Sequence, residues 1–148
     1  MPHAPPLPRL LAISTAVPPI EIGQQEMRRL APRLFDNFEG DLERLLPVFD
    51  NAGIARRYSC MPLDWYEKSH GGVQRNGLYI DHALDLIEDA SRRALADSGL
   101  TNHDIDGVVA VSTTGIATPS LDAMLLDRLD LRRDVWRLPV FGLGCAGG

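Results

Sequence analysis

Val108-Val109-Ala110-Val111-Ser112 is the stretch of this 148-residue chain that decides its fold class. The run is short, uncharged and rich in β-branched residues, so it predicts a β-strand. Because polar residues do not alternate with apolar ones, we expect this strand to lie in a sheet that is covered on both faces.

Helical patterns alternate with apolar strands on both sides of this run. Residues 78–98 carry apolar side chains at the spacing of one helix face, and Gly99 is expected to end that helix. Thr118 and Pro119 are typical of the N-cap and the first residue of a second helix. Residues 138–141 (LPVF) predict another strand. Such alternation indicates a layered α/β architecture with parallel or mixed strand pairing.

The N-terminal half of the chain has shorter patterns. Residues 10–14 predict a strand, and residues 21–34 and 41–51 predict two helices. Gly53 is expected to end the second of these helices, and residues 55–74 are expected to be irregular.

Composition and charge are those of an ordinary globular domain. The chain is 45% hydrophobic and 24% charged, and its net charge of -5 argues against nucleic acid or an anionic membrane as the main partner. No apolar run approaches the ~18 residues of a membrane span, and the proline-rich start has no signal-peptide core. We therefore expect a cytoplasmic protein, with residues 1–9 as a flexible lead and residues 10–148 as one partial domain. The four histidines show no metal-ligand spacing, so we expect no metal site.

A glycine-rich turn with a single cysteine follows the last predicted strand. Residues 142–148 read GLGCAGG, with Cys145 at the centre. Glycines accept positive φ angles, so the chain can reverse sharply and hold the side chain between them away from the turn. The free N–H groups of a helix that begins here would favour the thiolate and could stabilise an oxyanion. These features make Cys145 a candidate nucleophile.

Two other interpretations of this turn remain open on residue chemistry alone. Residues 142–147 also satisfy the G-x-G-x-x-G pattern of dinucleotide-binding modules. Alternatively, the turn carries a small buried cysteine, since free cysteine is among the most buried residue types. The other cysteine, Cys60, is expected to be a packing residue.

Four blocks of sequence together resemble the N-terminal part of the chalcone and stilbene synthase family, the type III polyketide synthases, in their bacterial form. The blocks are residues 53–58 (GIARRY), residues 99–109 with the run DIDGVV, residues 112–120 (STTGIATPS) and residues 139–148 (PVFGLGCAGG). They occur in the order and at the spacing of the family, from residue 10 to the last residue.

The resemblance implies a thiolase-like fold of the layered α/β/α type, of which this chain would be an incomplete N-terminal half. It also implies a homodimeric acyltransferase that takes CoA thioesters as substrates and needs no further cofactor. An acyl-CoA starter would load onto Cys145, and malonyl-CoA would be decarboxylated to a carbanion that attacks this thioester. The expected products are small polyketides of the resorcinol, pyrone or hydroxynaphthalene type. A ketoacyl-ACP synthase of the fatty-acid type is the alternative enzyme.

Several positions carry over from the family residue by residue. The resemblance places Thr113 in the wall of the starter pocket. It places Thr118 where plant members have a methionine that reaches into the cavity of the partner subunit. Of three basic positions near the CoA phosphates, only Arg44 is matched in charge, because Pro47 and Asn51 stand at the other two.

The histidine and asparagine that activate malonyl-CoA in this family belong to its C-terminal half, and none of the four histidines of this chain matches that position. We therefore expect residues 1–148 alone to have no condensing activity.

Overall fold

The computed structural model describes residues 7–35 and 38–147. By its internal contacts the chain divides into two compact units, one of residues 17–75 and one that joins residues 1–16 to residues 76–148. The assignment of residues 10–148 to a single partial domain stays a prediction. Of the predicted flexible lead, residues 1–6 lie outside the described residues, and residues 7–9 are exposed and belong to neither helix nor strand.

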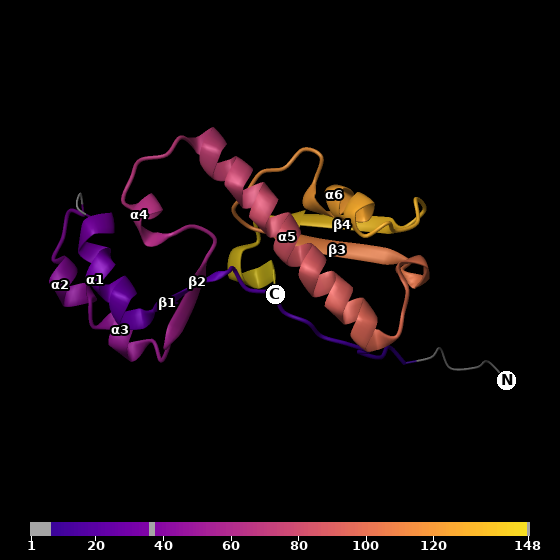
Figure 1. Ribbon diagram of the computed structural model, residues 1–148, viewed down its shortest axis with the longest axis horizontal. Coiled ribbons are helices and arrows are strands. Elements are labelled where there is room, and N and C mark those ends of the chain that lie inside the picture. Colours follow the sequence, from indigo (N-terminus) through magenta and orange to yellow (C-terminus); the bar gives the residue numbers. More distant parts are fainter. Residues whose placement is uncertain (1–6, 36–37, 148) are drawn as a thin grey trace. The chain divides into compact units, whose positions relative to one another are not determined.

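Residues 17–75 form a small antiparallel strand pair with short helices (Figure 1). Strands β1 and β2 pair so that Ile20 lies opposite Ser59. The elements are β1 (Ile20–Gly23), α1 (Gln24–Leu34), α2 (Leu42–Leu45), α3 (Val48–Asn51), β2 (Arg56–Ser59) and α4 (Leu63–Tyr66).

The start of helix α1 explains why the first predicted helix, at 21–34, is three residues too long. The buried side chain of Gln24 donates to the Phe49 carbonyl at 2.8 Å and accepts from Arg57 Nε at 2.9 Å. These contacts pin the first residue of α1 to α3 and to β2. Strand pairing therefore takes the residues before Gln24, and this long-range pairing overrides their local helical preference.

Two other predictions in this unit need correction. The predicted helix over 41–51 is two short helices, because Pro47 stands between them as the N-cap of α3. The predicted irregular segment over 55–74 contains β2, α4 and the first residues of α5. Gly53 follows α3 with φ of +65°, as predicted for the residue that ends this helix.

The second unit contains a parallel strand pair, β3 and β4, and two main helices, α5 and α6 (Figure 1). The strand register runs from Gly107 opposite Trp136 to Ser112 opposite Phe141. The elements are α5 (Gly72–Ser98), the 3-10 helix η1 (Asn102–Asp104), β3 (Gly107–Ser112), α6 (Leu121–Arg128), β4 (Trp136–Phe141) and the 3-10 helix η2 (Gly144–Gly147).

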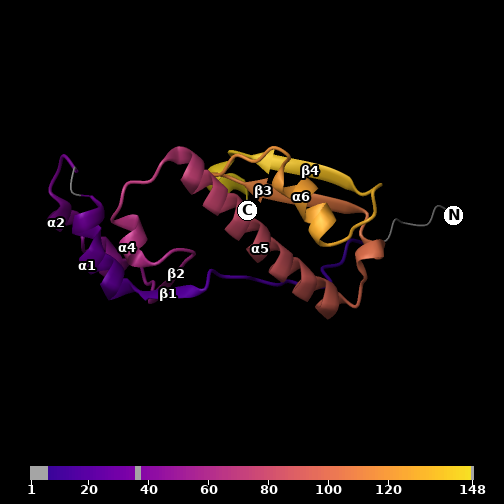
Figure 2. The ribbon, with the colours of Figure 1, turned by 45° about the horizontal axis from the view of Figure 1, so that its top comes forward.

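Helices α5 and α6 cover one face of this strand pair (Figure 2). Leu125 of α6 and its C-cap Leu129 belong to the buried core, against which Ile87 of α5 and Val108 of β3 pack. Successive strand residues point to opposite faces, so Val109 and Val111 lie on the other face.

The expectation that β3 is covered on both faces is wrong for the part of the chain that the structure describes. Val109 is 56% exposed and Val111 is 43% exposed. Both helices lie on the face of Val108, and on the other face Gly147 of the short η2 segment lies against Val111.

The predicted strand over 10–14 is also wrong. These residues are extended, and Leu10, Leu11 and Ile13 are largely exposed. They run beside α5 and β3, where residues 9–12 line a shallow hollow. Within the described residues they make no backbone hydrogen bonds to a neighbouring strand, so no ladder forms.

Helix α6 begins later than its sequence pattern predicts. The carbonyl of Ser120 accepts from the N–H groups of Ala123 and Met124 at 2.9 and 3.1 Å, which makes Ser120 the N-cap. Thr118 and Pro119 are joined by a cis peptide bond in the preceding loop. The N-cap assigned to Thr118 is therefore wrong.

Ion pairs join the exposed edges of α5 and α6. Arg128 Nη1 lies 2.6 Å from Asp85 and 3.2 Å from Glu88, and Arg92 lies 2.8 Å from Glu88. Arg92 also donates to the backbone carbonyl of Arg128 at 2.6 Å. Acidic side chains of α5 are therefore paired with arginines on the solvent-exposed side of the helix.

This cluster predicts how acid acts on the contact between the two helices. The hydrogen bond from Arg92, and then the one from Arg128, hold the pKa of the Glu88 carboxyl below its usual range. Such a carboxyl stabilises the fold above its unfolded pKa of about 4.3, and the contribution is lost as the pH falls through the lower folded value. In urea unfolding of the full-length gene product, we expect Glu88→Gln to lower the midpoint at pH 7. The difference from the parent should vanish near about pH 3. A difference that is the same at both pH values would contradict this prediction.

None of the helices in the described part of the chain is long and apolar enough to cross a membrane.

Candidate functional site

Three of the predicted site residues, Thr113, Thr118 and Cys145, lie in segments that follow the carboxyl ends of the parallel strand pair. Strands β3 and β4 end side by side at Ser112 and Phe141. The N–H of Gly142 donates to the Ser112 carbonyl at 3.1 Å, so the pairing continues one residue past β4. The loop that starts at Thr113 and the turn that carries Cys145 therefore leave the same edge. In open α/β sheets the carboxyl ends of the strands are where ligands bind.

The turn has the backbone that its glycines predict. Gly142 has φ of +81° and Gly144 has φ of +55°, a region that side chains other than glycine rarely adopt. Ala146 N–H donates to the Leu143 carbonyl at 3.1 Å, which closes a single 3-10 turn that includes Cys145. The expected helix at Cys145 is thus one 3-10 turn that begins one residue earlier.

Cys145 is a free, exposed thiol. This exposure contradicts the alternative of a buried cysteine in a tight turn. The opposite holds for Cys60, which is half-buried and whose thiol pKa is raised by that burial. Because the thiolate is the reactive form, Cys60 is the poorer nucleophile by its surroundings.

Gly147 brings the turn back against β3. An added Cβ at this position would lie 2.6 Å from Val111 Cγ1, closer than real carbon atoms approach. A glycine at this position therefore lets η2 pack on the face of β3 that α5 and α6 leave open.

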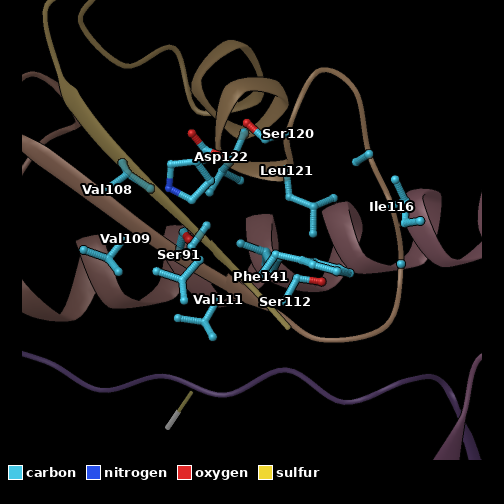
Figure 3. A pocket seen from close by; sticks show the side chains of 17 residues that line it. Ser91, Val108, Val109, Val111, Ser112, Ile116, Ser120, Leu121, Asp122 and Phe141 are labelled. Carbon is cyan, nitrogen blue, oxygen red and sulfur yellow. The ribbon is translucent and has the colours of Figure 1, made fainter. Parts of the chain in front are cut away.

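A cavity of about 470 Å³ lies under the loop that follows β3, between α5, α6 and the strand pair (Figure 3). Ser112, Ile116 and Phe141 are among its lining residues, and the lining is mainly apolar. Thr113, Thr118 and Cys145 do not line it. Gly115, Ile116 and Ala117, which lie between these two threonines in the same loop, form this part of the cavity wall.

A buried ion pair near this cavity was not predicted from the sequence. Asp122 is only 1% exposed, and its Oδ2 lies 2.9 Å from Nη1 of Arg137. Its Oδ1 has no hydrogen-bond partner within the described part of the chain. A signal was present in the sequence, since Asp122 stands between Leu121 and Leu125 on the apolar stripe of its helix.

Arg44 belongs to the other unit of the chain. It lies on the short helix α2, where its backbone N–H donates to the N-cap Asp41 at 3.2 Å. Its role toward CoA phosphates stays a prediction. His70, in the same unit, stacks on Trp65 with ring centroids 3.9 Å apart and hydrogen-bonds to the Trp65 carbonyl, which gives this histidine a structural role.

Comparison with known proteins gives the chain a family. The model of the N-terminal domain of chalcone and stilbene synthases matches residues 7–148. The chain belongs to this family. A 1,3,6,8-tetrahydroxynaphthalene synthase of Streptomyces peucetius subsp. caesius is 39% identical over 137 residues, which are 93% of this chain and 36% of that protein. The family predicted from the four sequence blocks is therefore confirmed.

Solved structures of the chalcone and stilbene synthase family share the fold. The 1,3,6,8-tetrahydroxynaphthalene synthase of Streptomyces coelicolor A3(2), a bacterial type III polyketide synthase, superposes with a TM-score of 0.76 at 27% identity, over 86% of this chain and 36% of that one. CsyB complexed with CoA-SH superposes with a TM-score of 0.80 at 28% identity, over 93% of this chain and 38% of that one. The predicted fold class is confirmed as the N-terminal part of a thiolase-like fold.

The chain spans less than two fifths of the length of these family members. The match to chalcone and stilbene synthases favours the polyketide interpretation over both alternatives, the ketoacyl-ACP synthase and the dinucleotide-binding module.

Proposed function

We propose that Cys145 is the acyl-accepting nucleophile of a type III polyketide synthase. One observation carries this proposal: in a chain of this family, an exposed thiol directly follows two positive-φ glycines, Gly142 and Gly144, at the carboxyl edge of a parallel strand pair. A nucleophile needs such exposure, and the sharp glycine turn lets its side chain stand away from the backbone.

The proposed reaction has two stages. The thiolate of Cys145 attacks the carbonyl carbon of an acyl-CoA, the C–S bond to CoA breaks, and the CoA thiolate leaves and takes up a proton. Malonyl-CoA then loses CO₂, and the electron pair of the broken C–C bond forms a carbanion. The carbanion attacks the enzyme-bound acyl carbonyl and releases the sulfur of Cys145. Splitting loading from condensation replaces one difficult step with two easier ones.

Residues other than the cysteine have supporting roles in this proposal. Thr113 follows directly on the end of β3 and is proposed to face the starter acyl group, with Thr118 further along the same loop. Arg44 is proposed to attract the CoA phosphates. CsyB, a structural relative, is known in complex with CoA-SH, which supports CoA thioesters as the substrate class. We further propose a homodimer that works in the cytoplasm.

The product class follows the relatives. The proteins of similar sequence and fold include 1,3,6,8-tetrahydroxynaphthalene synthases. We therefore propose a small cyclised polyketide of the hydroxynaphthalene, resorcinol or pyrone type.

Intact-protein and peptide mass spectrometry test the loading step directly. The full-length gene product is incubated with acetyl-, hexanoyl- or dodecanoyl-CoA, without malonyl-CoA. We expect one acyl group on the peptide that contains Cys145 and none on the peptide with Cys60, because burial keeps the Cys60 thiol protonated. Prior alkylation of Cys145 with iodoacetamide should block the acyl group. Acylation of another residue would refute Cys145 as the nucleophile. If NAD, but not acyl-CoA, protects Cys145 from alkylation by iodoacetamide, the proposal is also refuted, and the turn is a nucleotide-binding site.

A further inference from the structure

The loop between β3 and α6 is held by one turn of helix α5. Asn76 of α5 makes two hydrogen bonds to the backbone of a single residue, Ile116. Its Nδ2 donates to the Ile116 carbonyl at 2.8 Å, and its Oδ1 accepts from the Ile116 N–H at 2.9 Å. The Asn76 carboxamide thus pairs with both backbone polar groups of Ile116, as a neighbouring β-strand would. The two bonds together fix the position and the orientation of the Ile116 backbone.

Tyr79, three residues further along the same helix, holds the beginning of the loop. Its hydroxyl lies 2.5 Å from Ser112 Oγ. Its ring lies against Gly115, where an added Cβ would be only 1.8 Å from Tyr79 Cδ1. Only a glycine at position 115 therefore leaves room for this ring.

Apolar burial does not account for the position of this loop. The side chain of Ile116 is 70% exposed, although both polar groups of its peptide are paired. Loops held only by packing bury their apolar side chains, whereas this loop is held by directed hydrogen bonds. Such a fixed loop is what a site requires when it must keep a defined shape.

The loop held in this way is the one that matters for acyl recognition. Thr113 lies between the two anchor points, Ser112 and Gly115, and Thr118 follows the third, Ile116. Ser112 is also the residue whose carbonyl accepts from Gly142 at the start of the cysteine turn. Gly115 and Ile116 line the cavity under the loop. A shift of the loop would therefore change the wall of the acyl site without removing a group from the cysteine turn.

We propose that Asn76 and Tyr79 are positioning residues that set the selectivity of this enzyme for the length of the starter acyl group. They act through the Ser112–Thr118 loop. This inference rests on the proposed function, since it assumes that the acyl group is held beside that loop.

The test uses Asn76→Ala and Tyr79→Phe in the full-length gene product, each with a matched control. Tyr66→Phe removes a similar tyrosine–serine pair, because the Tyr66 hydroxyl lies 2.7 Å from Ser59 Oγ in the other unit. Asn102→Ala removes an asparagine that donates to the Leu129 and Asp130 carbonyls of a different loop. The controls thus lose comparable hydrogen bonds away from the Ser112–Thr118 loop.

Two measurements separate positioning from mere stability. Hydrogen exchange of the Ile116 amide should be about tenfold faster in Asn76→Ala and unchanged in the controls. The ratio of kcat/KM for acetyl-CoA to that for dodecanoyl-CoA should shift by about fivefold or more in Asn76→Ala and in Tyr79→Phe, the two clamp variants. In the controls the ratio should shift by less than about twofold. A loss of folded protein lowers both rate constants equally and leaves this ratio unchanged.

The outcomes are distinct. If the parent protein turns over acyl-CoA and the ratio stays within about twofold in both clamp variants, the inference is wrong and the proposed function stands. The inference is equally wrong if the controls shift the ratio as much as the clamp variants do. If the parent protein does not accept any acyl-CoA, the proposed function itself fails, and the inference fails with it.

Discussion

Cys145→Ala in the full-length gene product is expected to lower the rate of polyketide formation by about a thousandfold or more. The reason is chemical: without the sulfur, no covalent acyl intermediate forms, and the carbanion from malonyl-CoA has no positioned acyl carbonyl to attack. Product formation from acetyl-CoA and malonyl-CoA, followed by liquid chromatography and mass spectrometry, measures the loss. The acyl adduct expected in the loading experiment should disappear as well.

Cys60→Ala is the matched control for that variant. Cys60 is half-buried in the unit of residues 17–75, and burial raises the pKa of its thiol. Since it takes no part in the proposed reaction, its loss should leave the rate within about twofold of the parent. A Cys145→Ala protein that keeps more than about a tenth of the parent rate would refute Cys145 as the nucleophile.

Arg137→Met is expected to lower the stability of the β3–β4 unit much more than the loss of a surface ion pair would. Asp122 is 1% exposed, and Arg137 lies 2.9 Å from its carboxylate. Removing the cation leaves a buried carboxylate without a counter-charge. Because the Arg137 side chain is itself 39% exposed, we expect a cost of about 2 kcal/mol, below that of a fully buried pair. Urea unfolding of the full-length gene product at pH 7 measures this loss as a lower midpoint.

The control for Arg137→Met is Arg133→Met. Arg133 pairs with Asp127 at 3.0 Å, but these two side chains are 87% and 68% exposed, so their pair contributes about 0.5 kcal/mol or less. The double variant Asp122→Leu with Arg137→Met should recover much of the loss, because it removes the buried charge together with its partner. Equal midpoints for Arg137→Met and Arg133→Met would show that Asp122 does not depend on Arg137.

Local sequence signals predicted those elements that are stabilised by neighbouring residues in the chain. The strand expected at 108–112 is found at Gly107–Ser112, and the helix expected at 78–98 ends at Ser98. Gly99 follows with φ of +72°, in the conformation that stops a helix. The cysteine turn is of the same kind, because its glycines alone permit its backbone.

The failures have a common physical cause. Residues 10–14 have the composition of a strand, but a strand also needs a neighbour, and no described residue provides one. Thr118 has the chemistry of an N-cap, yet the helix begins only after Ser120. In both cases a residue type permits a structure that only distant contacts can select.

The candidate site likewise has features that local sequence predicts and features that depend on distant contacts. Sequence blocks identified the family and singled out Cys145 as the candidate nucleophile, because a candidate nucleophile is recognised by its own residue type and its immediate neighbours. The residues that hold the site together were not visible in this way. Asn76 meets Ile116 across 40 positions of sequence, and Asp122 meets Arg137 across 15.

The sequence by itself determined the α/β class, the family and the glycine-rich turn around Cys145, since these follow from local patterns and glycine geometry, whereas the exposure of the thiol came from the structure. Only the tertiary structure decided which face of β3 is covered, that Asp122 is buried with Arg137, and that α5 holds the loop beside the cysteine turn. Each of these depends on pairs of residues far apart in the chain, and their meeting is set by the packing of whole helices on a strand pair rather than by any single segment.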